Sequence, residues 1–201
     1  MTNNINIIII LIPFTVFLFS LIYLLKIYFL RREHLTRAAT IVFIVIFLTV
    51  LAKIFLSLGF QYYVWSQNGL SKFLLPPYQP VAYFARYSWQ HFIMSPAIGI
   101  VVSFALVLYF WILNKIFKKQ YLDFEDMLIL VSGAMIVGWP NLIAYLVIAF
   151  VLTIMRIFYL FYIKREMQRV PLTGALIVAA FITLLIGDYL AQILSLGFLK
   201  V

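Results

Sequence analysis

Six apolar runs, separated by short polar connections, make up most of the chain. They cover residues 6–30, 39–60, 93–114, 124–139, 142–163 and 172–194. A helix needs about 20 residues to cross the hydrocarbon layer of a bilayer, and all of these runs except the fourth reach that length. The pattern therefore predicts an all-α polytopic membrane protein, with about six transmembrane helices in a single integral membrane domain over residues 1–201.

The fourth run is short and ends in a turn signal. Residues 124–139 are followed directly by Pro140 and Asn141, and proline disfavours helical geometry in the residue before it. We therefore expect the fourth and fifth runs to form a tight helical hairpin. The small residues Gly133, Ala134 and Gly138 in this run permit close contact between helices.

The longest polar connection, residues 61–92, is dense in tyrosine, tryptophan and phenylalanine. These amphipathic rings favour the headgroup layer of a membrane. We expect short helices that lie along the outer membrane surface and are broken at Pro76 and Pro77. Two interpretations stay open for this outer interfacial loop: an aromatic belt with no specific ligand, or a docking surface for another membrane protein.

The composition agrees with lipid as the surrounding medium. Apolar residues make up 66% of the chain and charged residues 10%, whereas soluble domains are nearer half and a quarter. The first run has no positively charged segment before it and is too long for a signal peptide, so we expect a retained transmembrane helix. The absence of cysteine excludes disulfides, thiolate metal sites and cysteine nucleophiles.

The net charge of +9 is distributed unevenly between the two sides of the predicted bundle. Nine basic residues occupy alternate connections, namely Arg31, Arg32, Arg37, Lys115, Lys118, Lys119, Lys164, Arg165 and Arg169. The other side has only Lys72, Arg86 and Lys200. The positive-inside rule then places the N-terminus outside and the basic connections in the cytoplasm, for a multi-pass protein of the plasma (inner) membrane. The basic residues are expected to meet lipid headgroups, and no nucleic-acid partner is predicted.

Three acids precede the fourth run, and three interpretations compete for them. Asp123, Glu125 and Asp126 would cap a helix N-terminus and pair with the nearby Lys118 and Lys119. Alternatively, they form an ion or proton site, since acids at membrane depth are costly and often functional. The third interpretation is catalysis by carboxylates. No P-loop, GxSxG or HExxH motif is present, and neither a metal nor an organic cofactor is expected.

The segment FEDMLILVSGAMIVGW, residues 124–139, resembles the second catalytic motif of the prepilin leader peptidases. These are polytopic membrane aspartic peptidases, whose motif reads G-x-G-D and continues into an apolar helix that ends in G-W. Asp126 falls on the catalytic aspartate of the family, and Gly138 and Trp139 fall on the later G-W. The resemblance places Asp126 at the cytoplasmic face, the side to which the basic connections independently assign it.

A second segment extends the likeness. RVPLTGALIVAAFITLLIGDYL, residues 169–190, resembles the R-I-P-F-G-P segment of the family and aligns Arg169, Pro171 and Gly174. The resemblance covers about a third of the chain. The sequence departs from the family where Glu125 replaces the glycine before the aspartate and Leu128 replaces a lysine.

Aspartic peptidase chemistry requires two carboxylates, one acting as general base on a water and one polarising the scissile carbonyl. The family has its first catalytic aspartate near the cytoplasmic end of an early span. Glu33 is the only acid of this chain in that region. The resemblance therefore implies a catalytic pair of Asp126 and Glu33, which requires the first run to pack beside the fourth.

Three functions remain open from the sequence. The first is a membrane aspartic endopeptidase that cleaves the leaders of prepilin-like substrates at the cytoplasmic face. The second is a degenerate, non-catalytic relative that acts as a scaffold or assembly factor, for example with pilus or secretion components. The third is an unrelated small transporter or lipid-handling protein, for which we expect a cavity near mid-membrane containing Asp188 or Arg156.

Two basic residues lie inside predicted spans. Lys53, near the outer end of the second run, is expected to extend its side chain toward the membrane surface. Arg156, in the fifth run, is expected either to extend in the same way or to pair with an acid of the fourth run.

Overall fold

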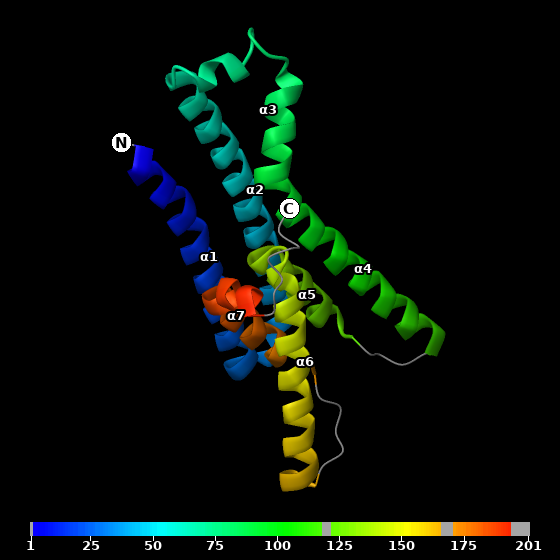
Figure 1. Ribbon diagram of the computed structural model, residues 1–201. Helices are drawn as coiled ribbons and strands as arrows, with labels where there is room; N and C mark the ends of the chain where they lie inside the picture. The colour runs from blue at the N-terminus through cyan, green and yellow to red at the C-terminus, as the bar shows by residue number, and fades with distance from the viewer. Residues whose placement is uncertain (1, 118–121, 166–170, 194–201) are drawn as a thin grey trace.

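The structure is a computed structural model, and it describes residues 2–117, 122–165 and 171–193 (Figure 1). Within these ranges the chain is almost entirely helical and contains no strand. The helices are α1 (Thr2–Leu30), α2 (Leu35–Gln67), α3 (Val81–Ser88), α4 (Met94–Phe117), α5 (Phe124–Val137), α6 (Asn141–Tyr159) and α7 (Thr173–Ile193). The prediction of an all-α protein is confirmed.

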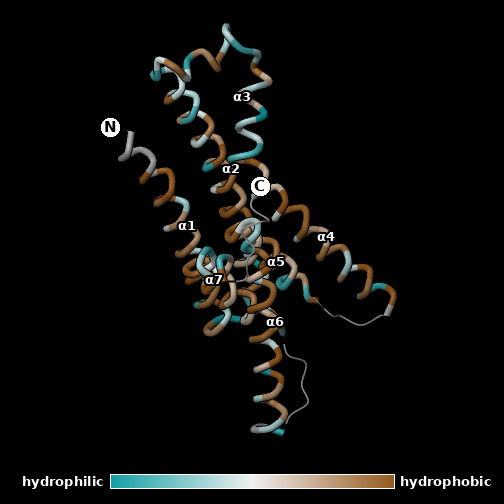
Figure 2. The backbone as a smooth tube through the Cα atoms, viewed as in Figure 1, coloured by the Kyte–Doolittle hydropathy of each residue, from teal (hydrophilic) through white to brown (hydrophobic). Residues whose placement is uncertain are grey.

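Five helical stretches are long and apolar enough to cross a membrane. They are Ile9–Leu30, Arg32–Gln67, Val81–Ile116, Asn141–Tyr162 and Thr173–Ile193. Their outward faces carry large apolar side chains, and Phe19 and Phe55 are each 69% exposed. In Figure 2 most of α1, α2, α4 and α6 carries the colour of hydrophobic residues. Exposing so much apolar surface to water is unfavourable. The protein is therefore membrane-embedded and multi-pass, with lipid around its helices.

The short helix α5 lies at the centre of the bundle, where it packs against α2, α4, α6 and α7 (Figure 1). Nine of its 14 residues are buried. A helix of that length extends about 21 Å, less than the roughly 30 Å of the hydrocarbon layer. The fourth apolar run therefore differs from the other five: it is apolar because other helices surround it, and it is too short to span the membrane alone.

The connection at residues 61–92 differs from its prediction. Residues 61–67 continue α2, and α3 runs through a π-helical turn at Trp89–Ile93 directly into α4. The two ends form a helical hairpin because their rings pack together: Trp65 lies 4.8 Å from Tyr87 and 5.6 Å from Phe84 between ring centroids. The expected separate surface helices are replaced by these extensions, and Pro76 and Pro77 lie in the turn between them, as predicted.

Small residues allow α5 to pack closely against its neighbours. A methyl group on Gly133 would lie only 2.5 Å from the hydroxyl oxygen of Tyr145, a side chain of α6 that is fully buried. Gly99 of α4 also lies close to α5: a methyl group added to it would lie 3.4 Å from the carbonyl oxygen of Ala134. At its C-terminal end α5 stops at Gly138, whose φ of 69° suits glycine, and α6 begins three residues later. The short turn between the fourth and fifth runs is confirmed.

Candidate functional site

The sequence around Asp123 begins α5. Asp123 occupies the N-cap position, and its carboxylate accepts a hydrogen bond from the backbone N–H of Asp126. In return, the Asp126 carboxylate accepts one from the backbone N–H of Asp123, at 3.5 Å. This reciprocal capping box satisfies amides that the first helical turn leaves unpaired. The capping interpretation of the acids is therefore correct for both residues.

Asp126 also binds a second helix. Its Oδ1 accepts a hydrogen bond from the Oγ1 of Thr173, the first residue of α7, and the residue is only 1% exposed. No salt bridge to Asp126 occurs among the described residues. The carboxylate instead lies in the first turn of α5 and against the first residue of α7, where the positive ends of two helix dipoles meet. Within the described part of the chain, helix ends and a hydroxyl thus stabilise this acid.

The neighbouring acid contacts a third helix. The Oε1 of Glu125 accepts a hydrogen bond from the Oγ1 of Thr36 in α2, at 2.5 Å. Adjacent residues on a helix point about 100° apart, so Glu125 and Asp126 face different neighbours. We call the two hydrogen-bonded pairs, Thr36 with Glu125 and Asp126 with Thr173, the carboxylate clamp. The clamp joins α5 to both α2 and α7 at its N-terminal end.

Glu33 lies in a different environment from Asp126. It belongs to the 3₁₀ turn Arg32–His34 between α1 and α2, and its side chain is 80% exposed. Its described partner is His34, at 3.4 Å between Oε1 and Nε2. No hydrogen bond or ion pair among the described residues joins Glu33 to Asp126. One predicted catalytic carboxylate is therefore at the surface of the protein and the other is in its core.

The other predicted partners of the acids lie outside the described residues or bind elsewhere. Lys118 and Lys119 lie outside the described residues, as does Arg169, which the resemblance aligns with the family. Arg156 donates a hydrogen bond to the hydroxyl of Tyr28 in α1, at 2.8 Å, and not to an acid of α5. The ring of Tyr28 in turn lies against Gly174 of α7. A methyl group added to Gly174 would lie 3.0 Å from the Cε1 atom of that ring. Arg156 therefore helps to hold α6, α1 and α7 together.

Asp188 lines a cavity, which is the feature that the transporter hypothesis predicts. The cavity measures about 410 Å³ and also includes Asn141 and Thr183. The side-chain amide of Asn141 donates to Asp188, at 3.3 Å. Asp188 lies about 22 Å along α7 from Thr173. The cavity and the carboxylate clamp thus lie toward opposite ends of α7.

The structure adds two site residues that sequence reasoning missed, Thr36 and Thr173. Both lie far from the acids in sequence, and a lone threonine at the start of an apolar run carries no signal for a distant partner. Among the described residues, no group of three histidine, cysteine, aspartate or glutamate side chains could hold a metal ion. The chain matches no protein-family model, no curated protein and no solved structure.

Proposed function

We propose that this protein is a non-catalytic, prepilin-peptidase-like membrane protein that acts as a scaffold or assembly factor. The observation that carries the proposal is the carboxylate clamp. Asp126, the residue that the resemblance assigns to catalysis, has its two oxygens bonded to Thr173 and to the capping box of α5. A carboxylate used in this way supports a structural role in joining helices.

The chemistry of aspartic peptidases supports the same conclusion. Two carboxyl groups must share a water or a proton, so that one is ionised while the other is protonated. Glu33 is exposed and bonded to His34, and Glu125 faces α2 through Thr36. Among the described residues, no second carboxylate is hydrogen-bonded to the Asp126 carboxylate. A single buried acid cannot hold both catalytic roles.

The hairpin of α2 and α3 supports a role in assembly. It carries exposed aromatic and apolar side chains, among them Tyr62, Tyr63, Phe73 and Tyr78, together with Leu70 at 85% exposed. In Figure 1 it extends from the bundle at the end away from α6 and the start of α5. A prepilin-like membrane protein, or another pilus or secretion component, is the partner class that fits the resemblance, and an exposed aromatic surface suits contact with another protein.

A leader-cleavage assay tests the proposal directly. Full-length protein in lipid nanodiscs would be mixed with a prepilin-like substrate that retains its basic leader, and the substrate mass would be followed. We expect the leader to stay intact with the wild-type chain, Asp126→Asn and Glu33→Gln alike, while the wild-type chain retains the substrate in a pull-down. Leader release by the wild-type chain that Asp126→Asn abolishes would overturn the proposal.

The membrane aspartic endopeptidase is the second candidate, and one contact favours it. The hydrogen bond from Thr173 to Asp126 joins the two segments that carry the resemblance, residues 124–139 and 169–190. An enzyme assembled from those segments would have Asp126 beside the start of α7. In this case Glu33 would have to leave the surface and approach Asp126, and Glu33→Gln would lower cleavage as strongly as Asp126→Asn.

We propose further that the protein lies in the plasma (inner) membrane with its N-terminus outside and the basic connections in the cytoplasm. The described ends of these connections support this orientation: Thr36, next to Arg37, is hydrogen-bonded to Glu125 in the first turn of α5, so the basic connection before α2 lies at the same end of the bundle as the start of α5. Since the chain has no cysteine, single cysteines report orientation without background.

Cysteine labelling in whole cells measures the orientation. Leu70→Cys, in the turn between α2 and α3, is expected to react with a membrane-impermeant maleimide added outside. Arg32→Cys, exposed between α1 and α2, is expected to react only after the membrane is permeabilised. The reverse pattern would exclude the proposed orientation and with it a cytoplasmic position for Asp126.

A further inference from the structure

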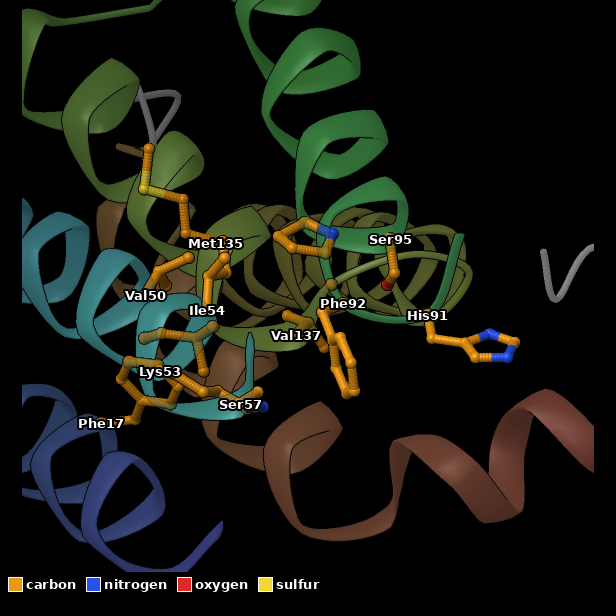
Figure 3. Close-up of a pocket in the computed structure, with 13 residues that line it drawn as sticks. Phe17, Val50, Lys53, Ile54, Ser57, His91, Phe92, Ser95, Met135 and Val137 are labelled. Atoms are coloured by element: carbon orange, nitrogen blue, oxygen red, sulfur yellow. The ribbon is translucent and has the colours of Figure 1, made fainter. Parts of the chain in front are cut away.

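A pocket at the opposite end of α5 from the clamp carries a cation that no described residue pairs with. It measures about 240 Å³ and lies where α2, the turn before α4 and the last turn of α5 meet (Figure 3). Lys53 and Ser57 come from α2, His91 and Phe92 from the π-helical turn, and Ser95 from α4. The other lining side chains are mostly apolar, so a small polar region lies against an apolar floor.

Lys53 is the charged group of this pocket, and no described residue pairs with it. None of the described hydrogen bonds or salt bridges includes its ammonium group, and no acid lines the pocket. His91 borders the pocket, but its ring packs edge-on against Tyr87 at 4.1 Å and points away from Lys53 in Figure 3. A cation that no described residue pairs with, beside an apolar floor, favours an anion in the pocket.

Ser57 supplies a hydroxyl donor beside that charge. It lies one helical turn after Lys53, so both side chains project from the same face of α2 (Figure 3). Thr40 and Thr49, on the same helix, each donate to the carbonyl four residues earlier, at 2.9 and 2.7 Å. Ser57 makes no such bond among the described contacts, so its hydroxyl is available to a ligand. An ammonium and a hydroxyl side by side form a suitable pair of donors for a phosphate oxygen.

The depth of Lys53 matches the phosphate level of a bilayer. It follows Arg37 by sixteen residues on α2, which places it about 24 Å farther along the helix axis. With Arg37 at one boundary of a hydrocarbon layer of about 30 Å, Lys53 lies a few ångströms inside the other boundary. The lysine stem spans that remaining distance, so its ammonium reaches the headgroup layer.

A second cavity also has Lys53 in its lining and is suited to an acyl chain. It measures about 630 Å³, lies between α1 and α2, and is lined mostly by apolar side chains, of which Leu48 and Ala52 precede Lys53 on α2 and lie on its bilayer side. Lys53 is the one residue that lines both cavities. Polar donors at one end and an apolar groove at the other complement a molecule with a phosphate headgroup and a hydrocarbon tail.

We propose that Lys53 and Ser57 form a binding site for the phosphate of an anionic phospholipid, whose acyl chain occupies the groove between α1 and α2. Lys53 supplies the charge and Ser57 a hydrogen bond, and the lipid belongs to the leaflet opposite the basic connections. The chemistry recognised is a phosphate attached to an apolar chain in a headgroup that has no cation of its own to balance the charge, and the groove assigns it to a membrane lipid in preference to free phosphate.

Native mass spectrometry of the full chain tests the site. Protein purified in a mild uncharged detergent would be titrated with phosphatidylglycerol, or with phosphatidylcholine of the same acyl chains, and the bound lipid counted. We expect Lys53→Met to weaken phosphatidylglycerol binding about tenfold, since a hydrogen bond to a charged group is worth that much or more. Lys53→Arg, which keeps the charge, should retain binding within about threefold of the wild-type chain.

Lys115→Met is the matched control, because it removes the same charge at a place far from the pocket. Lys115 lies near the C-terminal end of α4, whereas the pocket lies at the N-terminal end of that helix. Its ammonium lies 5.4 Å from the centre of the Trp111 ring. We expect no change beyond about twofold for this variant. An equal loss in both lysine variants would overturn the site, as would equal binding of phosphatidylcholine. A third arm adds inorganic phosphate: displacement of the lipid at equimolar phosphate would show that the site takes a free anion and would exclude the lipid.

Discussion

Gly133→Ala is expected to destabilise the protein by roughly 2–3 kcal/mol, the cost of forcing an added group into a closely packed core. The new methyl carbon would lie 2.5 Å from the hydroxyl oxygen of Tyr145 and 2.6 Å from its Cζ. Tyr145 belongs to α6 and is fully buried against α5, so a shift of its ring would disturb the surrounding core. Thermal unfolding in detergent, followed by circular dichroism, should show a clear fall in Tm.

Gly59→Ala is the matched control for this variant. Gly59 also lies inside a helix, α2, but a methyl group there would meet nothing within 4 Å. Alanine favours helix over glycine by up to about 1 kcal/mol, so this variant is expected to keep or slightly raise Tm. Combining Gly133→Ala with Tyr145→Leu should recover part of the loss, since the two sites are coupled. Equal Tm values for the two alanine variants would contradict the packing described for α5.

Asp126→Ala is expected to cost about 2–3 kcal/mol, the usual value for a buried hydrogen bond to a charged group. The change removes the acceptor for Thr173 and one half of the capping box of α5. The buried hydroxyl of Thr173 would then lack its partner, which adds to the loss. The measurement is again the apparent Tm in detergent, supported by protease resistance of the folded chain.

Glu125→Ala, one residue away, provides the comparison. Its bond to Thr36 lies near the surface, so we expect a cost of less than about 1 kcal/mol. Thr173→Val tests the partner side, and the double variant with Asp126→Ala should cost little more than either single one. Fully additive effects would show that Asp126 and Thr173 act independently and would remove the clamp as the basis of the proposed function.

The fold class was readable from the sequence because lipid imposes a simple rule on length and polarity. Runs of about 20 apolar residues identified the crossing helices, and Pro140 and Asn141 located the turn between α5 and α6. The nature of α5 was not readable in the same way. A helix enclosed by other helices and a helix surrounded by lipid are both apolar, so only the length of residues 124–139 distinguished the two cases.

The aromatic segment shows a second limit. Residues 61–92 have the composition of an interfacial loop, but much of this segment is helical in the structure, as the end of α2 and as α3. The rings of Trp65 and Tyr87 pack against each other and hold these two helices together as a hairpin. Cross-helix pairing of this kind depends on register between distant segments. For the same reason the sequence does not predict Thr173 as the partner of Asp126. The acids stand out in the sequence by their charge, whereas identifying their hydrogen-bonding partners requires knowledge of how α5 packs against α7.

The length of α2 makes the protein responsive to bilayer thickness. Its 33 residues extend about 50 Å, whereas the hydrocarbon layer measures about 30 Å. In a thicker membrane the helix stands upright and its aromatic end sinks toward the headgroups, whereas in a thinner one it tilts or protrudes farther into water. The height of Leu70 above the lipid surface therefore reports the mismatch between the length of α2 and the thickness of the bilayer. Because this mismatch costs free energy, we expect the protein to partition into membranes whose thickness suits α2.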